Sequence, residues 1–394
     1  MVASNMITER VDLTKPFPIV SYNLPFPEAC SAHMSNTLHS SKAYIIVSGS
    51  LSRSTNALQR LEEALGKERV AGVRKGMTPH TLYSELLEIA KEVKKSSADC
   101  IVTLGGGSLI DGAKGMVFAL ANDIDLDDPN AFDAFLKKSM VFRKARTENP
   151  KTATSDQKPS TIPIICITTT LSAGEYNPAG GATNNLTKHK QLFVDPSFTG
   201  PKIIIWDPEL TLTAPEKVWL STGLRAVDHC VERVEVVDSG VVEDEKGWWG
   251  FEGEAGCLKG GAERGSHGIG HQLGPYGVPH AETTCILMPS VQKYNSRVNA
   301  TTQATLSTLL WDDPIVSPIL TSHSLSPSTS DLGDILDVVI RELGFPRTLK
   351  EYGVKREDLE KIAESSLGDI CSQKNAVPLV ERVQVMEVLE MCYG

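Results

Sequence analysis

No apolar run in this sequence is long enough to cross a lipid bilayer, so we expect neither a membrane span nor a membrane partner. Positive charge is also scarce, because 39 lysines and arginines stand against 49 acidic residues, for a net charge of −10 at pH 7. Nucleic-acid binding requires a basic surface, so we expect a small-molecule partner and no nucleic acid. The N-terminal stretch MVASNMITERVDLTKPFP lacks the apolar core and cleavage site of a secretory signal, which favours the cytoplasm.

Closely spaced cysteine pairs are missing as well. The eight cysteines include no C-x-x-C pair, so neither a zinc ribbon nor a disulfide framework is indicated, and we expect free thiols. What the sequence does have is length, because 394 residues exceed the size at which one hydrophobic core usually stops growing. We therefore expect two domains.

The first half of the chain alternates strand-like apolar runs with amphipathic helical stretches, a pattern typical of a parallel α/β sheet covered on both faces. The expected strands lie in AYIIVSG (43–49), DCIVTLGGGS (99–108), TIPIICITTT (161–170) and KIIIWDP (202–208). The expected helices lie in STNALQRLEEALG (54–66) and TPHTLYSELLEIAKEVKKSSA (78–98).

Strand signals fade from Pro208 onward, and 332–349 and 356–391 have helical patterns. We therefore predict an α/β domain over 1–207 and a helical domain over 208–394. Two polar stretches without structure signals, 145–160 and 312–331, are predicted to be surface loops.

The glycine-rich stretch LGGGSLIDGAKG lies where an expected strand ends and a helix begins. Because glycine has no Cβ, the N–H groups of Gly105, Gly106, Gly107 and Ser108 can approach an anion, which suits a phosphate group. The spacing differs from G-x-G-x-x-G, and an ordinary strand-to-helix turn would explain the same residues. This stretch alone does not identify the class of enzyme.

Four segments in this order resemble the iron-type (group III) alcohol dehydrogenase family: GGGSLIDGAK, TTTLSAGE, DPELTLTAPEKVWLSTGLRAVDHCVE and SHGIGHQLGPYGVPHAETTCILMPSVQKYN. The resemblance extends from about Ala43 to the end of the chain. It implies the dehydroquinate synthase-like fold, with an α/β N-terminal domain that binds NAD or NADP, an all-α C-terminal domain and a catalytic cleft between them. It also implies an NAD(P)-dependent oxidoreductase acting on CH–OH/C=O or CH–CH groups.

The resemblance assigns eight residues to the pyrophosphate loop and the nicotinamide end of the cofactor: Gly105, Gly106, Gly107, Ser108, Asp111, Lys114, Thr169 and Thr170. Family members with strict NAD preference often carry an aspartate just after the first strand, where its charge repels a 2′-phosphate. Gly49 occupies that position here, so the sequence leaves NADH and NADPH both open.

Metal-dependent members of the family hold Fe or Zn with three histidines and an aspartate that precedes the first histidine by four residues. The histidines correspond to His229, His267 and His280, but Arg225 occupies the aspartate position. Arginine offers no lone pair, and its charge would repel a dication about 4 Å away by about 8 kcal/mol at an effective dielectric near 20. We therefore expect no Fe or Zn. Two alternatives stay open: Asp228 could replace the missing ligand with local distortion, and three histidines plus water could hold zinc.

The maleylacetate reductases within this family are similar to the chain in three details. They lack the aspartate ligand, carry PHAE where metal enzymes usually have PHG, and place four residues between paired threonines and a glutamate, as in TTLSAGE. They are regarded as working without metal. The resemblance therefore implies reduction of a carbonyl or an enol carboxylate, and Arg225 could hold an anionic substrate through two parallel hydrogen bonds.

Proton donation to the reduced substrate suits a histidine, because imidazole titrates near neutrality. His271 corresponds to a cleft histidine of the family, and it lies four residues after His267, so both should face one side of the expected helix. His229 and His280 are also assigned to the catalytic site. The remaining histidines are expected to be structural: His33, His39, His80, His189 and His323.

Residues 240–265 do not resemble the family. They hold eight glycines and the adjacent Trp248 and Trp249, where family members have several helices, so at least roughly 30 residues are missing, equivalent to two or three average helices. An error in the assigned exon boundaries or a real deletion would produce such a segment. An inactive relative that keeps nucleotide binding is therefore a second hypothesis.

Two further hypotheses are a metal-dependent alcohol dehydrogenase and an elimination enzyme like dehydroquinate synthase, which Arg225 disfavours because that chemistry needs zinc. Family members often form homodimers, but no feature of this sequence demonstrates an interface.

Overall fold

The computed structural model describes residues 6–11, 15–148, 152–196, 200–238 and 264–394. Two compact units divide the chain, Met1–Pro215 and Glu216–Gly394, here called unit 1 and unit 2. The division falls after Pro215 rather than at 207, because the short helix α7 (Pro208–Thr211) buries Leu210 in a core of unit 1. Most of the atypical segment predicted at 240–265 lies outside the described residues.

Unit 1 contains a seven-stranded sheet in the order β1-β2-β9-β6-β5-β3-β4. Its strands are β1 Ile7–Arg10, β2 Ile19–Tyr22, β3 Ala43–Val47, β4 Val70–Lys75, β5 Cys100–Gly105, β6 Ile164–Thr168 and β9 Ile203–Ile205. All neighbouring strands pair in parallel except β1 and β2, which pair antiparallel. The prediction of a purely parallel sheet was therefore wrong at this edge. A separate antiparallel pair, β7 (Ala179–Thr183) and β8 (Lys190–Val194), was not predicted.

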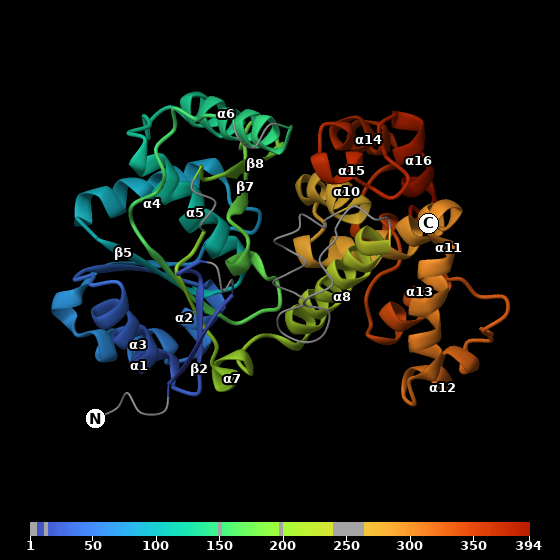
Figure 1. The fold of residues 1–394 in the computed structure, drawn as a ribbon, viewed down its shortest axis with the longest axis horizontal. Coiled ribbons are helices and arrows are strands. Elements are labelled where there is room, and N and C mark those ends of the chain that lie inside the picture. Colours follow the sequence, from blue (N-terminus) through green and yellow to red (C-terminus); the bar gives the residue numbers. More distant parts are fainter. Residues whose placement is uncertain (1–5, 12–14, 149–151, 197–199, 239–263) are drawn as a thin grey trace. The chain divides into compact units, whose positions relative to one another are not determined.

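Helices cover both faces of the seven-stranded sheet, as Figure 1 shows. They are α1 Phe26–Ala32, α2 Gly49–Ser54, α3 Ala57–Leu65, α4 Tyr83–Ser96, α5 Gly107–Ala121 and α6 Pro129–Glu148. Side chains of a strand alternate between faces, so Ile45 packs with α1 and α3 while Tyr44 and Ile46 pack with α4 and α5. Each fully buried isoleucine contributes about 1.5–3 kcal/mol. The α/β prediction for this half is confirmed.

Two predicted loops are partly helical. The stretch 145–160 begins inside α6, which continues to Glu148, and the stretch 312–331 contains helix α12 (Val316–Ser322), which buries Leu320. Residues 343–349, expected to continue a helix, leave it at Leu343, and Gly344 follows with a φ of +78°. Local sequence patterns therefore missed α12 and placed the end of α13 seven residues too late.

Unit 2 is helical throughout its described residues, as predicted. Its helices are α8 Glu216–Asp238, α10 Gly265–Leu273, α11 His280–Asp312, α12, α13 Leu332–Glu342, α14 Leu359–Leu367, α15 Ile370–Gln373 and α16 Arg382–Met391. One core joins α10 and α11 to α14 and α16, and another joins α8 to α11 and α13. Helix α11 is therefore common to both cores, and His280 is its first residue.

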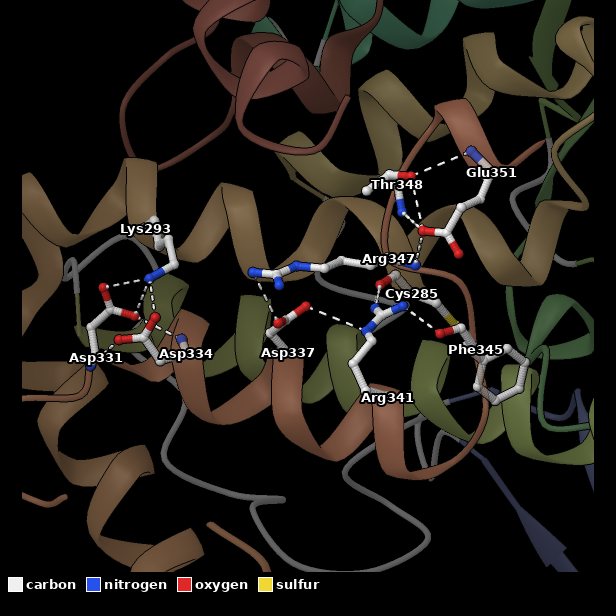
Figure 2. Close-up of polar contacts among 10 residues, drawn as sticks. All are labelled: Cys285, Lys293, Asp331, Asp334, Asp337, Arg341, Phe345, Arg347, Thr348 and Glu351. Carbon is white, nitrogen blue, oxygen red and sulfur yellow. Dashed lines mark hydrogen bonds and ion pairs between the residues drawn. The ribbon is translucent and has the colours of Figure 1, made fainter. Parts of the chain in front are cut away.

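Polar contacts fasten α13 along α11 (Figure 2). Near the start of α13, Lys293 on α11 contacts the carboxylate of Asp331 at 3.1 Å. Further along, Arg341 donates a hydrogen bond to the backbone oxygen of Cys285 at 3.0 Å and pairs with Asp337 at 3.4 Å. The two contacts between the helices lie about two turns apart on α11, at Cys285 and Lys293, and they hold α13 against α11.

Candidate active site

The glycine turn joins β5 to the N-terminus of α5. Gly105 has a φ of +147°, a conformation that L side chains rarely adopt, and a Cβ there would lie 2.7 Å from Leu109 Cδ1 and 2.9 Å from Ser48 Cβ. Gly106 is the N-cap of α5, and Gly107 is its first residue. The first N–H groups of a helix have no intrahelical acceptor and carry the positive end of its dipole. The turn therefore fits a phosphate group of a dinucleotide.

The threonine segment after β6 packs against this turn. A Cβ on Gly106 would lie 3.2 Å from the Thr170 methyl group, and Thr170 Oγ1 lies 3.0 Å from Ser172 Oγ. Thr169, the preceding residue, is buried. The structure thus brings the glycine turn and the threonines together within unit 1.

Asp111 and Lys114 hold α5 to its neighbours. Lys114 Nζ lies 2.7 Å from the backbone oxygens of Gly174 and Ala179 and 3.2 Å from Asp111 Oδ1. Asp111 Oδ2 in turn accepts a hydrogen bond from the N–H of Gly181 at 3.2 Å. Because these contacts match the three N–H donors of the ammonium group, the pair stabilises the fold behind the turn.

Gly49 is the first residue of α2 and is separated from β3 by Ser48 alone. In the family, the residue at this position distinguishes enzymes with strict NAD preference from the others. A Cβ on Gly49 would lie 2.9 Å from Arg53 Nη1, so the guanidinium group of Arg53 lies over this glycine. Position 49 therefore carries no negative charge and has a cation beside it.

The four histidines assigned to catalysis gather in unit 2. His229 lies on α8, His267 and His271 lie on α10, and His280 begins α11. Ring centroids are 4.7 Å apart for His229 and His267, 6.5 Å for His267 and His271, and 6.0 Å for His271 and His280. Of the histidines expected to be structural, four belong to unit 1, and His323 at the end of α12 contacts Glu342 at 2.7 Å.

Arg225 is buried beside these histidines. Its Nη1 lies 3.3 Å from Thr284 Oγ1 and 3.5 Å from the backbone oxygen of His280, and the residue is 6% exposed. Burial, followed by the charge of Arg225, lowers the pKa of His229 to about 3. His229 is therefore a neutral imidazole at physiological pH, and its Nδ1 has no hydrogen-bond partner among the described residues.

Asp228 faces a hydrogen-bonded network rather than the side of α8 that carries His229. Its Oδ2 accepts hydrogen bonds from Ser266 Oγ at 2.6 Å and Thr284 Oγ1 at 3.2 Å. Burial raises the pKa of Asp228 to about 6. Burial and the neighbouring Asp228 also raise the pKa of Glu232, whose Oε2 lies 2.8 Å from His267 Nδ1. Sequence analysis missed Glu232, although its spacing of four from Asp228 placed both on one helical face.

Comparison with known proteins matches both halves of the chain to one family. Residues 25–208 match the model of the iron-containing alcohol dehydrogenases, and residues 259–393 match the C-terminal model of the same family. The chain belongs to the iron-containing alcohol dehydrogenase family. The family prediction is therefore confirmed, and the chain is an oxidoreductase of the NAD(P)-dependent dehydrogenase class.

Similar proteins include two fungal dehydrogenases. The chain is 33% identical to dehydrogenase FUM7 of Gibberella moniliformis, with 95% of this chain and 96% of the relative covered. It is 34% identical to dehydrogenase ALT3 of Alternaria alternata, with 88% and 98% covered. Maleylacetate reductase from Agrobacterium tumefaciens matches in fold, with a TM-score of 0.63, 20% identity and 98% and 99% of the two chains covered. NADH-dependent butanol dehydrogenase A from Thermotoga maritima gives a TM-score of 0.69, 18% identity and 96% and 97% coverage.

The alignment with FUM7 runs over 417 positions, although it covers 95% of a chain of 394 residues. The relative therefore carries residues that this chain lacks. The sequence predicted that residues are missing at 240–265. Of this segment, the structure describes only residues 264 and 265.

The set of metal ligands known from the family is incomplete in this chain. Arg225 occupies the position of the aspartate ligand, and the His229 and His267 rings are stacked, with 22° between their planes. Among the described residues, donor atoms within 4.8 Å of one another occur in two other groups, Asp228 with Glu232 and His267, and His271 with Asp369 and Cys371. Neither group is the expected set of His229, His267 and His280.

A second residue that sequence analysis missed is Asp369. Its Oδ2 lies 2.8 Å from His271 Nδ1, and both side chains are largely buried. The two residues are 98 positions apart, so no local pattern could pair them.

Within the described parts of the chain, no helix is both long enough and apolar enough to cross a membrane. All cysteines of these parts are free thiols.

Proposed function

We propose that the chain is a metal-independent, NAD(P)H-dependent reductase of a carbonyl or enol-carboxylate substrate, similar in its reaction to maleylacetate reductase. The observation that carries the proposal is the buried guanidinium group of Arg225 beside four histidines, at the position where metal-dependent relatives carry an aspartate. A fixed positive charge at this position favours a negatively charged substrate and disfavours a dication.

Each residue of the proposed site has a separate role. The turn of Gly105, Gly106, Gly107 and Ser108 would hold the pyrophosphate of the cofactor through backbone N–H groups. When bound, the reduced nicotinamide supplies a hydride to the substrate. Arg225 binds and orients the substrate carboxylate, because a guanidinium group can donate two parallel hydrogen bonds to it.

His271 is the proposed proton donor. The oxygen of a carbonyl group gains negative charge as its carbon accepts a hydride, and a protonated imidazole neutralises that charge by donating its proton. The His229 and His267 rings stack with their centroids 4.7 Å apart, and Arg225 contacts the backbone oxygen of His280. The low pKa of His229 keeps this ring neutral, so it adds no second cation beside the guanidinium group.

The first experiment measures metal content and turnover on the same preparation. Purified protein is analysed for iron and zinc, treated with a chelator, and assayed for NADH and NADPH oxidation with maleylacetate and with simple aldehydes. We expect less than stoichiometric metal, full activity after chelation, and a preference for the anionic substrate. Stoichiometric metal together with loss of activity on chelation would reject the metal-independent proposal.

The second experiment tests Arg225 itself. A charge-assisted hydrogen-bonded pair contributes about 1.5–3 kcal/mol, so Arg225→Ala should raise KM for an anionic substrate roughly 10- to 100-fold. A neutral aldehyde should be affected far less. Arg225→Lys is the matched control, because it keeps the charge and loses the planar fork of the guanidinium group. Its KM for the anionic substrate should lie between those of the original protein and Arg225→Ala. Equal effects on charged and neutral substrates would remove the carboxylate role.

A competing proposal follows from the residues that FUM7 carries and this chain lacks. If the missing residues support the histidines, the chain would bind the nucleotide without turning over a substrate. Titration with NADPH, followed by the fluorescence of the bound nucleotide, distinguishes this case from a misfolded chain, which binds nothing.

A further inference from the structure

His271 and Asp369 form a buried pair in unit 2. His271 Nδ1 lies 2.8 Å from Asp369 Oδ2, and the side chains are 10% and 5% exposed. Asp369 directly precedes α15, while His271 lies in the last turn of α10. The contact therefore depends on how closely these two helices approach each other.

Gly268 permits this approach. A Cβ on Gly268 would lie 2.2 Å from Ser372 Oγ and 2.5 Å from the Ser372 backbone nitrogen, so only a glycine fits between α10 and α15. His271 follows Gly268 by three residues, about one turn further along α10. The same close packing therefore brings the imidazole ring against Asp369.

The carboxylate of Asp369 is held in one orientation. Its Oδ1 accepts a hydrogen bond from the Cys371 N–H at 2.9 Å, which makes Asp369 the N-cap of α15. Its Oδ2 is left to face His271. Burial raises the pKa of Asp369, but the charge of His271 and these hydrogen bonds outweigh it and hold the pKa below its usual range. The carboxylate is therefore ionised and must accept, not donate, in its contact with the ring.

We propose that Asp369 is a positioning residue that keeps the proton of neutral His271 on Nδ1 and leaves Nε2 as the atom that donates to the substrate. This inference rests on the proposed role of His271 as the proton donor. Because a carboxylate in this position accepts from Nδ1–H, it fixes both the tautomer and the rotation of the ring.

The Nε2–H bond of the imidazolium breaks, its electron pair stays on Nε2, and the proton bonds to the substrate oxygen while the substrate carbon receives the hydride. The carbonyl group is reduced to an alcohol and the nicotinamide cofactor is oxidised. His271 is left as the neutral Nδ1–H tautomer, still hydrogen-bonded to Asp369.

The substitution Asp369→Asn tests the effect of Asp369 on the His271 tautomer while leaving its role as the N-cap of α15 in place. The Asn oxygen can keep the hydrogen bond from the Cys371 N–H, and its NH2 group then faces His271 Nδ1. An NH2 group can only donate, so Nδ1 must become the acceptor and the proton must move to Nε2. A neutral Nε2–H is a far weaker acid than an imidazolium, so donation from this atom should fail.

The experiment combines kinetics with a direct reading of the tautomer. We expect kcat of D369N to fall about 100-fold or more, the usual contribution of a positioned acid, while KM for NADPH stays within about 2-fold. In the full chain with 15N-labelled histidine, NMR should show the His271 proton on Nδ1 in the original protein and on Nε2 in D369N. The His271 signals are assigned from their loss in H271Q.

Asp331→Asn is the matched control, because Asp331 is also an N-cap aspartate of unit 2 and accepts from the Asp334 N–H at 2.8 Å. D331N should leave kcat and the His271 tautomer unchanged. The inference is overturned if the tautomer is the same in D369N and the original protein, or if the tautomer changes without loss of kcat. If the original protein reduces no carbonyl substrate, the proposed function fails, and the NMR comparison still decides whether Asp369 fixes the ring.

Discussion

Replacing Gly105 by alanine tests whether the turn between β5 and α5 needs glycine for its backbone as well as for its space. The residue has a φ of +147°, and a non-glycine residue in such a region costs about 1–3 kcal/mol. The added methyl group would also lie 2.7 Å from Leu109 Cδ1 and 2.9 Å from Ser48 Cβ, and such overpacking costs about 1–3 kcal/mol more. Alanine offsets about 0.4–1 kcal/mol by restricting the unfolded chain.

The expected net effect of Gly105→Ala is a loss of about 1–6 kcal/mol, against a typical total stability of 5–15 kcal/mol. Circular dichroism in urea measures the loss as a lower unfolding midpoint. NADPH binding should weaken as well, because the methyl group would displace the N–H groups proposed to bind the phosphate. Binding is measured by fluorescence without urea, where the variant is folded.

Gly277→Ala is the control for this prediction. Gly277 has a φ of +92°, but no atom lies within 4 Å of the position of its Cβ, so alanine there meets backbone strain alone, at about 1–2 kcal/mol. Gly105→Ala should therefore be the more damaging change. If both variants lose the same stability, or if Gly105→Ala binds NADPH like the original protein, the packing argument for the turn is wrong.

Two further predictions concern the cofactor and pH. Gly49→Asp places a carboxylate beside Arg53 and should raise KM for NADPH at least about 10-fold relative to NADH, since a negative charge there repels the 2′-phosphate; an unchanged ratio contradicts this reading. Burial raises the pKa of Glu235 to about 7 from the usual 4.5. Because the folded state holds the proton more tightly, its stability should fall as pH rises from 4.5 to 7, by up to about 3 kcal/mol. Glu235→Gln should flatten that fall in urea midpoints measured at pH 5 and 8, and an equally steep fall would exclude this carboxyl group.

The central strands of the sheet could be predicted because their sequences are continuous apolar runs rich in isoleucine and valine. β3, β5, β6 and β9 are fully buried, so nothing in their patterns competes with the strand signal. The edge strand β1, with the sequence ITER, has every side chain exposed, and β7, with the sequence AGGAT, contains two glycines. Neither strand carries an apolar pattern. Each forms because the rest of the fold supplies a neighbouring strand with which it can pair, and this cannot be predicted from its own residues.

The candidate site divides in the same way. The four histidines could be chosen because they stand in motifs that resemble the family, and the structure of unit 2 brings them together. Glu232 and Asp369 could not be assigned in that way, since each contacts a histidine on another helix. Asp369 in particular reaches His271 only through the packing of Gly268 against Ser372, and that contact joins segments about 100 residues apart. Pairwise tertiary contacts of this kind have no signature in a single sequence.

The guanidinium group buried at position 225 has a consequence for where such a protein can work. A bound metal ion exchanges with its surroundings, competes with other ions for its ligands and, in the case of iron, changes oxidation state. The charge of Arg225 is covalently part of the chain, does not exchange and has no redox chemistry. The proposed metal-independent site would therefore keep its charge through metal starvation and exposure to oxidants.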